Sequence, residues 1–135
     1  MRALQPVSIF LALSIATAAA AGEIDGSMPV TCKVDNARDC HPTETVCGPL
    51  KPDTNIEPVY SIDFAKKEVR SPYRRALLPV ANTSTNKDSL VLQGADLAFA
   101  YSAVIDRETG ALTVVVADSE GAYVAFGQCS VAVAK

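Results

Sequence analysis

Hydrophobic and polar residues alternate along most of the chain beyond residue 58, with the period of two that is typical of half-buried β-strands. In residues 59–64, for example, Tyr60, Ile62 and Phe64 are separated by polar residues. β-Branched residues are frequent, and the sequence contains no capped apolar stripe with the helical period of 3.6. The pattern therefore predicts an all-β protein.

Residues 88–131 predict an antiparallel meander, in which each strand pairs with the next one along the chain. The expected strands are residues 90–94, 97–105, 112–117 and 123–133. In the second of them, one face is expected to carry Leu97, Phe99, Tyr101, Ala103 and Ile105. Residues 106–110 predict a tight turn with Gly110 at a position of positive φ, and residues 118–121 repeat this turn chemistry.

The first half of the chain is less regular. Residues 22–58 are polar and rich in proline, which predicts an irregular, Cys-rich segment with one short strand at residues 30–34. Residues 76–80 predict an edge strand, because Pro79 has no N–H to donate to a neighbour. Residues 83–86 predict a loop.

Together these patterns predict one β-domain over residues 22–135, with antiparallel strands over residues 59–135. We expect a small antiparallel barrel or sandwich of about six to eight strands, stapled by disulfides, with the C-terminal meander at its centre. A chain of this size buries about two-thirds of its extended surface, which is enough for one core.

Residues 1–21 have the three parts of a secretory signal peptide. Arg2 gives a basic start, an apolar run follows from residue 7, and small residues close the segment at residues 16–21. The run is shorter than the about 20 residues that a spanning helix needs. We therefore expect cleavage after Ala21 and a periplasmic or secreted protein without a transmembrane segment.

The four cysteines, Cys32, Cys40, Cys47 and Cys129, all follow the expected cleavage point. An even number in a short exported chain indicates a disulfide framework. Three pairings are possible, and we favour Cys32–Cys129 with Cys40–Cys47. The first pair lies in the expected first and last strands, which we expect to be neighbours, and the second pair flanks a polar loop.

Composition and motifs argue against several functions. The net charge of −3 at pH 7 does not favour nucleic-acid binding, which usually requires a basic balance. His41, the only histidine, belongs to no Cys-x-x-Cys-His haem motif, and no Gly-x-Ser-x-Gly elbow accompanies it. Without Cys-x-x-Cys spacing, and with thiols that would pair on export, we predict no metal site, no thiol redox role and no cofactor.

The aspartates Asp63, Asp96, Asp106 and Asp118 lie at expected strand ends and turns, where aspartate usually has a structural role. A carboxylate pair of the glycosidase type stays open as an alternative. We therefore predict that the protein is not an enzyme and keep a hydrolase as the last alternative.

Basic residues gather in one segment of this acidic chain, and they are the candidate binding residues. They are Lys66, Lys67, Arg70, Tyr73, Arg74 and Arg75, with the tyrosine among the cations. A positive patch here would attract an anionic envelope component or an acidic partner protein. Alternatively, the cations protect an exposed sheet edge from aggregation.

Three features make the chain resemble small exported proteins of Gram-negative bacteria. They are the Ala-rich segment 16–21, the triplet Cys32, Cys40 and Cys47, and the closing segment 123–129. That group has no established activity, so the resemblance implies a compartment and a β-fold only. Periplasmic lysozyme inhibitors share the plan of signal, small β-barrel and disulfide, but their Ser-Gly-containing inhibitory loop has no match here.

We therefore expect a monomeric, non-catalytic binding or inhibitor module that recognises a protein or an anionic envelope component through residues 66–75. The alternative is a carrier that holds a small ligand inside the barrel. Alanines such as Ala98, Ala100 and Ala103 would leave space for such a ligand, or would equally allow tight packing.

Overall fold

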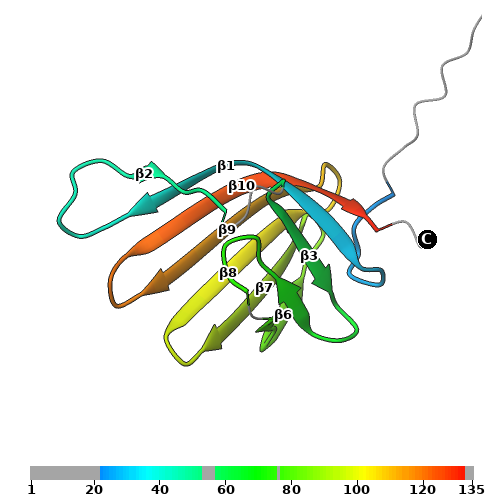
Figure 1. Cartoon of the computed structure of the whole chain (residues 1–135). Helices are drawn as coiled ribbons and strands as arrows, with labels where there is room; N and C mark the ends of the chain where they lie inside the picture. Colours follow the sequence, from blue (N-terminus) through cyan, green and yellow to red (C-terminus); the bar gives the residue numbers. More distant parts are fainter. Residues whose placement is uncertain (1–21, 53–56, 76, 133–135) are drawn as a thin grey trace, which may run out of the picture.

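The computed structural model describes residues 22–52, 57–75 and 77–132, in which the chain forms ten β-strands and no helix (Figure 1). The strands are β1 (Val30–Cys40), β2 (Gly48–Pro49), β3 (Val59–Asp63), β4 (Glu68–Arg70), β5 (Leu77–Pro79), β6 (Asn82–Thr85), β7 (Ser89–Asp96), β8 (Phe99–Asp106), β9 (Ala111–Asp118) and β10 (Ala122–Val131). The predicted all-β class is confirmed, with more strands than the six to eight expected. The predicted signal peptide lies outside the described residues, and these contain no helix that could span a membrane.

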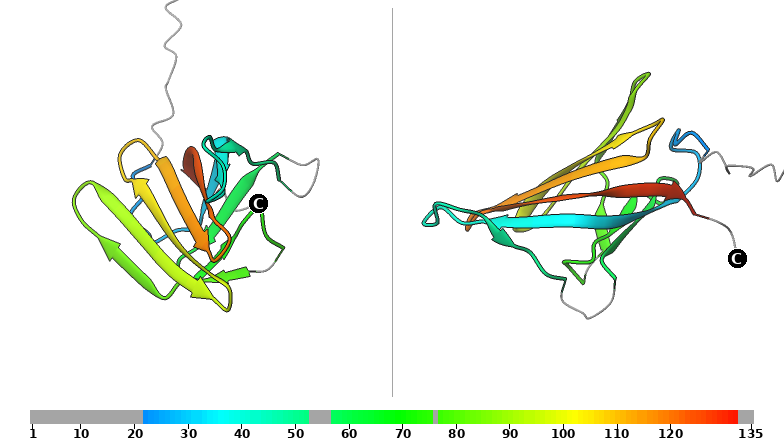
Figure 2. Two further views of the ribbon diagram at one scale, coloured as in Figure 1. Left: turned by 90° about the vertical axis from the view of Figure 1, so that its left-hand side faces the viewer. Right: turned by 90° about the horizontal axis from the view of Figure 1, so that it is seen from above.

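The ten strands form one antiparallel sheet that curls into a half-barrel (Figure 2). Their order across the sheet is β5-β4-β3-β1-β10-β9-β8-β7-β6, and β2 pairs with β1. The edge strands β5 and β6 follow each other along the chain, so the link between them crosses from one edge to the other. In this link the N–H of Ala81 donates to the carbonyl of Gln93 in β7 at 2.9 Å. β5 is the edge strand predicted from Pro79.

Strands β7 to β10 form the predicted meander, each paired with the next. The turn between β8 and β9 also has the predicted chemistry, because Gly110 has a φ of 77°. The carboxylate of Asp106 accepts the N–H groups of Glu108 and Thr109 at 3.1 and 2.7 Å. These bonds fix the hairpin and hold the pKa of Asp106 below its usual value, mainly through Thr109.

Three local expectations were wrong. Residues 82–85 form β6 and not a loop, because their backbone pairs with β7 although every side chain is exposed. The strand expected at residues 30–34 continues to Cys40, because β10 pairs along its whole length on both sides of a β-bulge. Leu97 lies in the turn between β7 and β8 and is fully exposed, whereas Phe99 on the same predicted face is buried.

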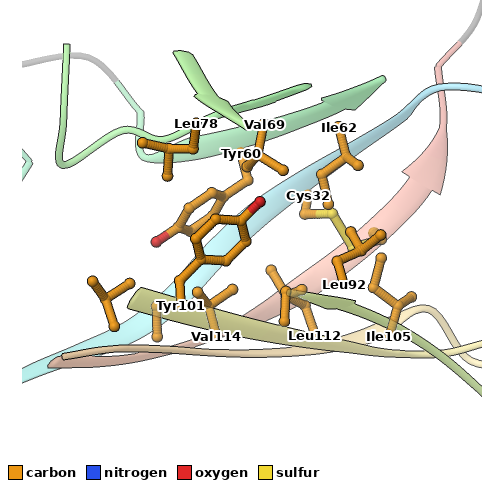
Figure 3. Close-up of a cluster of buried hydrophobic side chains, with 14 of the residues drawn as sticks. Cys32, Tyr60, Ile62, Val69, Leu78, Leu92, Tyr101, Ile105, Leu112 and Val114 are labelled. Carbon is orange, nitrogen blue, oxygen red and sulfur yellow. A yellow bond between two sulfur atoms is a disulfide. The ribbon is translucent and has the colours of Figure 1, made fainter. Parts of the chain in front are cut away.

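The hydrophobic core lies on the concave face of the sheet, where alternate residues of the long strands point inward (Figure 3). Its largest fully buried side chains are Tyr60, Ile62, Leu78, Leu90, Leu92, Ile105, Val30, Val116 and Cys32. They come from both halves of the sheet. Core formation therefore joins the N-terminal strands β1, β3 and β5 to the C-terminal meander.

Both predicted disulfides are confirmed. Cys32 and Cys129 face each other in the register of β1 and β10, and both are buried. Cys40 and Cys47 close the short loop between β1 and β2. The first bond ties the first long strand to the last one within the core, and the second ties down a loop at the end of the half-barrel.

Gly94 and Tyr101 lie where the edge strand β5 approaches the meander strands β7 and β8. The Tyr101 hydroxyl donates to the carbonyl oxygen of Pro79 in β5 at 2.9 Å. A Cβ atom at Gly94 would collide with that same carbonyl oxygen and with the Tyr101 ring. The missing side chain of Gly94 therefore permits the close approach of β5 to β7.

Candidate functional site

The described part of the chain has a pocket of about 220 Å³ at the end of the half-barrel where β1 and β9 finish and β10 begins. We call it the Arg74 pocket. It is lined by Asp39, His41, Leu50, Tyr73, Arg74, Val116, Asp118, Glu120, Gly121, Ala122 and Tyr123. Polar and charged side chains thus replace the aliphatic ones that fill the rest of the concave face.

The polar residues of the pocket that belong to strands lie on the inward-facing side of those strands. In β9, Leu112, Val114 and Val116 are buried on the concave face, and Asp118 is the next residue in the same phase. Asp39 of β1 lies opposite Tyr123 of β10 in the strand register. The pocket is therefore the polar end of the same face that forms the core.

Arg74 reaches into the pocket from the loop between β4 and β5. Its guanidinium lies 3.9 Å from the centre of the Phe99 ring, a cation–π contact. One terminal nitrogen, Nη2, is 3.4 Å from Oδ2 of Asp118, a long contact for an ion pair. Arg74 is thus held by a ring and a carboxylate, and neither contact uses its Nε.

Three tyrosines pack together, and two of them, Tyr73 and Tyr123, line the pocket. The Tyr73 ring lies between the other two, with its centroid 6.1 Å from that of Tyr60 and 5.6 Å from that of Tyr123. Both pairs are tilted by 60°, which is a favourable arrangement for aromatic rings. Tyr60 is 1% exposed and Tyr123 is 9% exposed, whereas Tyr73 is only partly buried.

Three buried polar atoms of this cluster have no hydrogen-bond partner among the described residues: the hydroxyls of Tyr60 and Tyr123 and Nε of Arg74. Burial, and then the neighbouring Tyr123 hydroxyl, raise the pKa of Tyr60 far above its ordinary value, so this phenol stays neutral. Leaving a buried polar group unsatisfied costs about 1–3 kcal/mol. Three such groups within one cluster depart from the rule that buried polar groups are hydrogen-bonded, and they require an explanation.

The rim of the pocket is acidic. Asp39, Asp118 and Glu120 supply carboxylates against the cation of Arg74 and the imidazole of His41. Backbone N–H groups of Glu120 and Gly121 hold the pKa of Asp118 below its ordinary value. The Asp39 carboxylate, 3.2 Å from Nε2 of His41, raises the pKa of that imidazole. At neutral pH, hydrogen-bond acceptors therefore surround the mouth of the pocket.

The structure does not gather the six predicted binding residues in one place. Tyr73 and Arg74 belong to the Arg74 pocket. Lys66 and Lys67 lie in the turn between β3 and β4, where Lys66 is 3.4 Å from Asp63 and Lys67 has a φ of 56°. The other two, Arg70 and Arg75, are exposed, with Arg70 on β4.

Sequence reasoning did not single out Tyr60, Tyr123 or the rim carboxylates as binding residues. The sequence of β9 did contain a signal for Asp118. Every second residue before it is apolar and buried, so a carboxylate at the next position of the same face is unusual. Asp39 had no such signal, because the β-bulge between Val34 and Asn36 shifts the inward phase of β1. The tyrosines were indistinguishable from ordinary core residues until the fold placed their hydroxyls together.

The described residues contain no group of three or more His, Cys, Asp or Glu side chains arranged to hold a metal ion. The pocket instead has tyrosine hydroxyls, a guanidinium and dispersed carboxylates, which together can both donate and accept hydrogen bonds.

The chain matches no protein-family model, and comparison with curated proteins and with solved structures also gives no match.

Proposed function

We propose that the protein is an exported, non-catalytic binding module and that the Arg74 pocket is its recognition site. The segment 1–21 supplies the export signal in this proposal. The two disulfides are consistent with an oxidising compartment outside the cytoplasm.

One observation carries the proposal: two residues that line the pocket, Tyr123 and Arg74, each have a buried polar atom without a partner among the described residues. A ligand that enters the pocket would give them hydrogen bonds that the protein does not supply. Such a ligand would recover part of the cost of leaving these atoms unsatisfied. The cluster would then be a preorganised site, because the free protein already contains the unsatisfied polar atoms in a fixed arrangement.

The size of the pocket favours one small group on a larger partner. At about 220 Å³ it is smaller than the about 300–1,000 Å³ that holds a drug-sized ligand. The buried side chains occupy the concave face where a carried ligand would lie. We therefore rank recognition of a protein or an anionic envelope component above transport of a small molecule.

The test compares pocket variants with variants of the exposed cations. Arg74→Met keeps the apolar stem on Phe99 and removes the guanidinium, whereas Arg70→Glu with Arg75→Glu reverses the exposed charges. Co-sedimentation would be measured with peptidoglycan, lipopolysaccharide and phosphatidylglycerol vesicles. We expect the wild type to bind at least one of them, Arg74→Met to lose about tenfold in affinity, and the double variant to bind normally.

Two results would contradict this proposal. If the double variant lost binding while Arg74→Met kept it, recognition would belong to the exposed cations and not to the pocket. If the wild type bound none of the three preparations, recognition of an envelope component would be wrong. A thermal melt of each variant separates lost binding from lost folding.

A further inference from the structure

We propose that the group recognised by the Arg74 pocket is one uncharged sugar ring. This inference rests on the proposed function and names the chemistry of its ligand. It follows from three properties of the pocket: the hydrogen bonds it offers, its aromatic wall and its size.

The hydrogen-bonding groups require a ligand that both donates and accepts. Arg74 Nε can only donate, and the rim carboxylates can only accept, whereas the hydroxyl of Tyr123 can do either. A sugar hydroxyl also does both. A ring that carries several hydroxyls can therefore accept from Arg74 and donate to Asp118 or Glu120.

A charged group fits the pocket itself less well, even where the partner carries charges elsewhere. An anion would accept from Arg74 Nε and from the tyrosine hydroxyls, but it would meet the carboxylates of Asp39, Asp118 and Glu120. Like charges brought together at an interface cost several kcal/mol. A cation would suit those carboxylates, but it has no acceptor for Arg74 Nε and would face the guanidinium itself. An uncharged polyol avoids both conflicts.

The tyrosines supply an apolar wall beside these polar groups. Tyr73 is partly exposed and packs at 60° against Tyr123, which lines the pocket with it. One face of a pyranose ring carries mainly C–H groups and contacts aromatic rings favourably, while its hydroxyls point outward in the ring plane. The pocket therefore combines an apolar wall with polar groups.

The volume limits the ligand to one ring. The pocket of about 220 Å³ holds about seven water molecules at about 30 Å³ each. One sugar ring fits this space and an oligosaccharide does not. Further rings of a polysaccharide would continue outside the mouth.

The experiment titrates the oxidised chain, labelled at tyrosine, with defined probes and follows the ring signals by NMR. The sugar probes are methyl β-glucoside and N-acetylglucosamine, and the charged probes are inorganic phosphate, acetate and methylammonium. We expect the sugars to shift the Tyr73 and Tyr123 signals saturably, with a dissociation constant of about 1–10 mM for one ring. Tyr123→Phe should weaken this binding about tenfold.

Tyr101→Phe is the matched control, because the Tyr101 hydroxyl is bonded to Pro79 and does not belong to the pocket. It should leave the sugar affinity unchanged. Shifts with phosphate, acetate or methylammonium but not with sugars would overturn the sugar inference and leave the pocket as a recognition site. If no probe shifted the tyrosines and Arg74→Met bound envelope preparations normally, both proposals would fall.

Discussion

At the scale of single residues, the buried tyrosines differ in whether their hydroxyl has a hydrogen-bond partner. The Tyr101 hydroxyl donates to Pro79 across the closing edges of the half-barrel. The equally aromatic Tyr60 and Tyr123 are buried with hydroxyls that neighbour each other but make no well-formed hydrogen bond among the described residues. The same chemical group therefore has opposite energetic consequences at these positions.

Removing the hydroxyls tests this difference. In the free protein, Tyr60→Phe and Tyr123→Phe should leave the free energy of unfolding unchanged or raise it by up to about 1 kcal/mol, because they delete an unsatisfied buried group. Tyr101→Phe should lower it by about 0.5–1.5 kcal/mol, because it deletes a hydrogen bond. Urea unfolding checks both, and a loss of more than about 2 kcal/mol in Tyr123→Phe would show that its hydroxyl is satisfied.

His41 gives the rim of the Arg74 pocket a dependence on pH. The nearby Asp39 raises the pKa of the folded imidazole above its ordinary value of 6.5. Such a group stabilises the fold fully below pH 6.5, and the contribution is lost as the pH rises through the higher folded pKa. His41→Gln should therefore destabilise the protein more at pH 5.5 than at pH 8.5.

Thermal melts of wild type and His41→Gln at the two pH values measure this difference. Asp39→Asn is the control, because it removes the main cause of the raised pKa and should abolish most of the difference. A His41→Gln effect that is equal at both pH values would contradict the assignment.

At the scale of elements, the closure of the half-barrel depends on a backbone approach that only glycine allows. Gly94 of β7 faces the Pro79 carbonyl of β5, with the Tyr101 ring beside it. Gly94→Ala should destabilise the protein by about 1–3 kcal/mol or more, because the backbone of β5 must move away. Gly48→Ala should change stability by less than about 0.5 kcal/mol, since nothing lies within 4 Å of a Cβ at Gly48.

Equal effects of the two alanine substitutions in urea unfolding would show that β5 approaches β7 less closely than described. A large effect confined to Gly94→Ala would support the closure.

The elements that sequence reasoning located well are those with a buried face. The meander was predicted because its strands alternate over eight or more residues and its turns carry Asp and Gly. β6 was missed because every one of its side chains is exposed, so only backbone pairing with β7 makes it a strand. The candidate site was half found for a related reason. Tyr73 and Arg74 stood out as charged and aromatic neighbours, whereas the contacts of Arg74, Phe99 and Asp118, come from β8 and β9.

At the scale of the whole molecule, the two disulfides should differ in their contribution to stability. In the loop-entropy description, the Cys32–Cys129 bond, with a sequence separation of 97, should stabilise the fold by about 4–5 kcal/mol. The Cys40–Cys47 bond, with a separation of 7, should contribute about 2.5 kcal/mol. Paired Cys→Ala variants, unfolded in urea, measure the two values, and a greater loss on removing the short-loop bond would contradict this ranking.

The place of β10 in the sheet also has a consequence for the order of events during synthesis. β10 lies between β1 and β9, so β1 cannot be joined to β9 through the sheet until residues 122–131 are available. If a chain emerges from a membrane channel N-terminus first, β10 crosses after the other strands. Until then, the sheet cannot connect β1, β3, β4 and β5 to the meander. The complete sheet therefore cannot form while such a chain is still crossing the channel. β10 joins β1 to β9 only after the crossing.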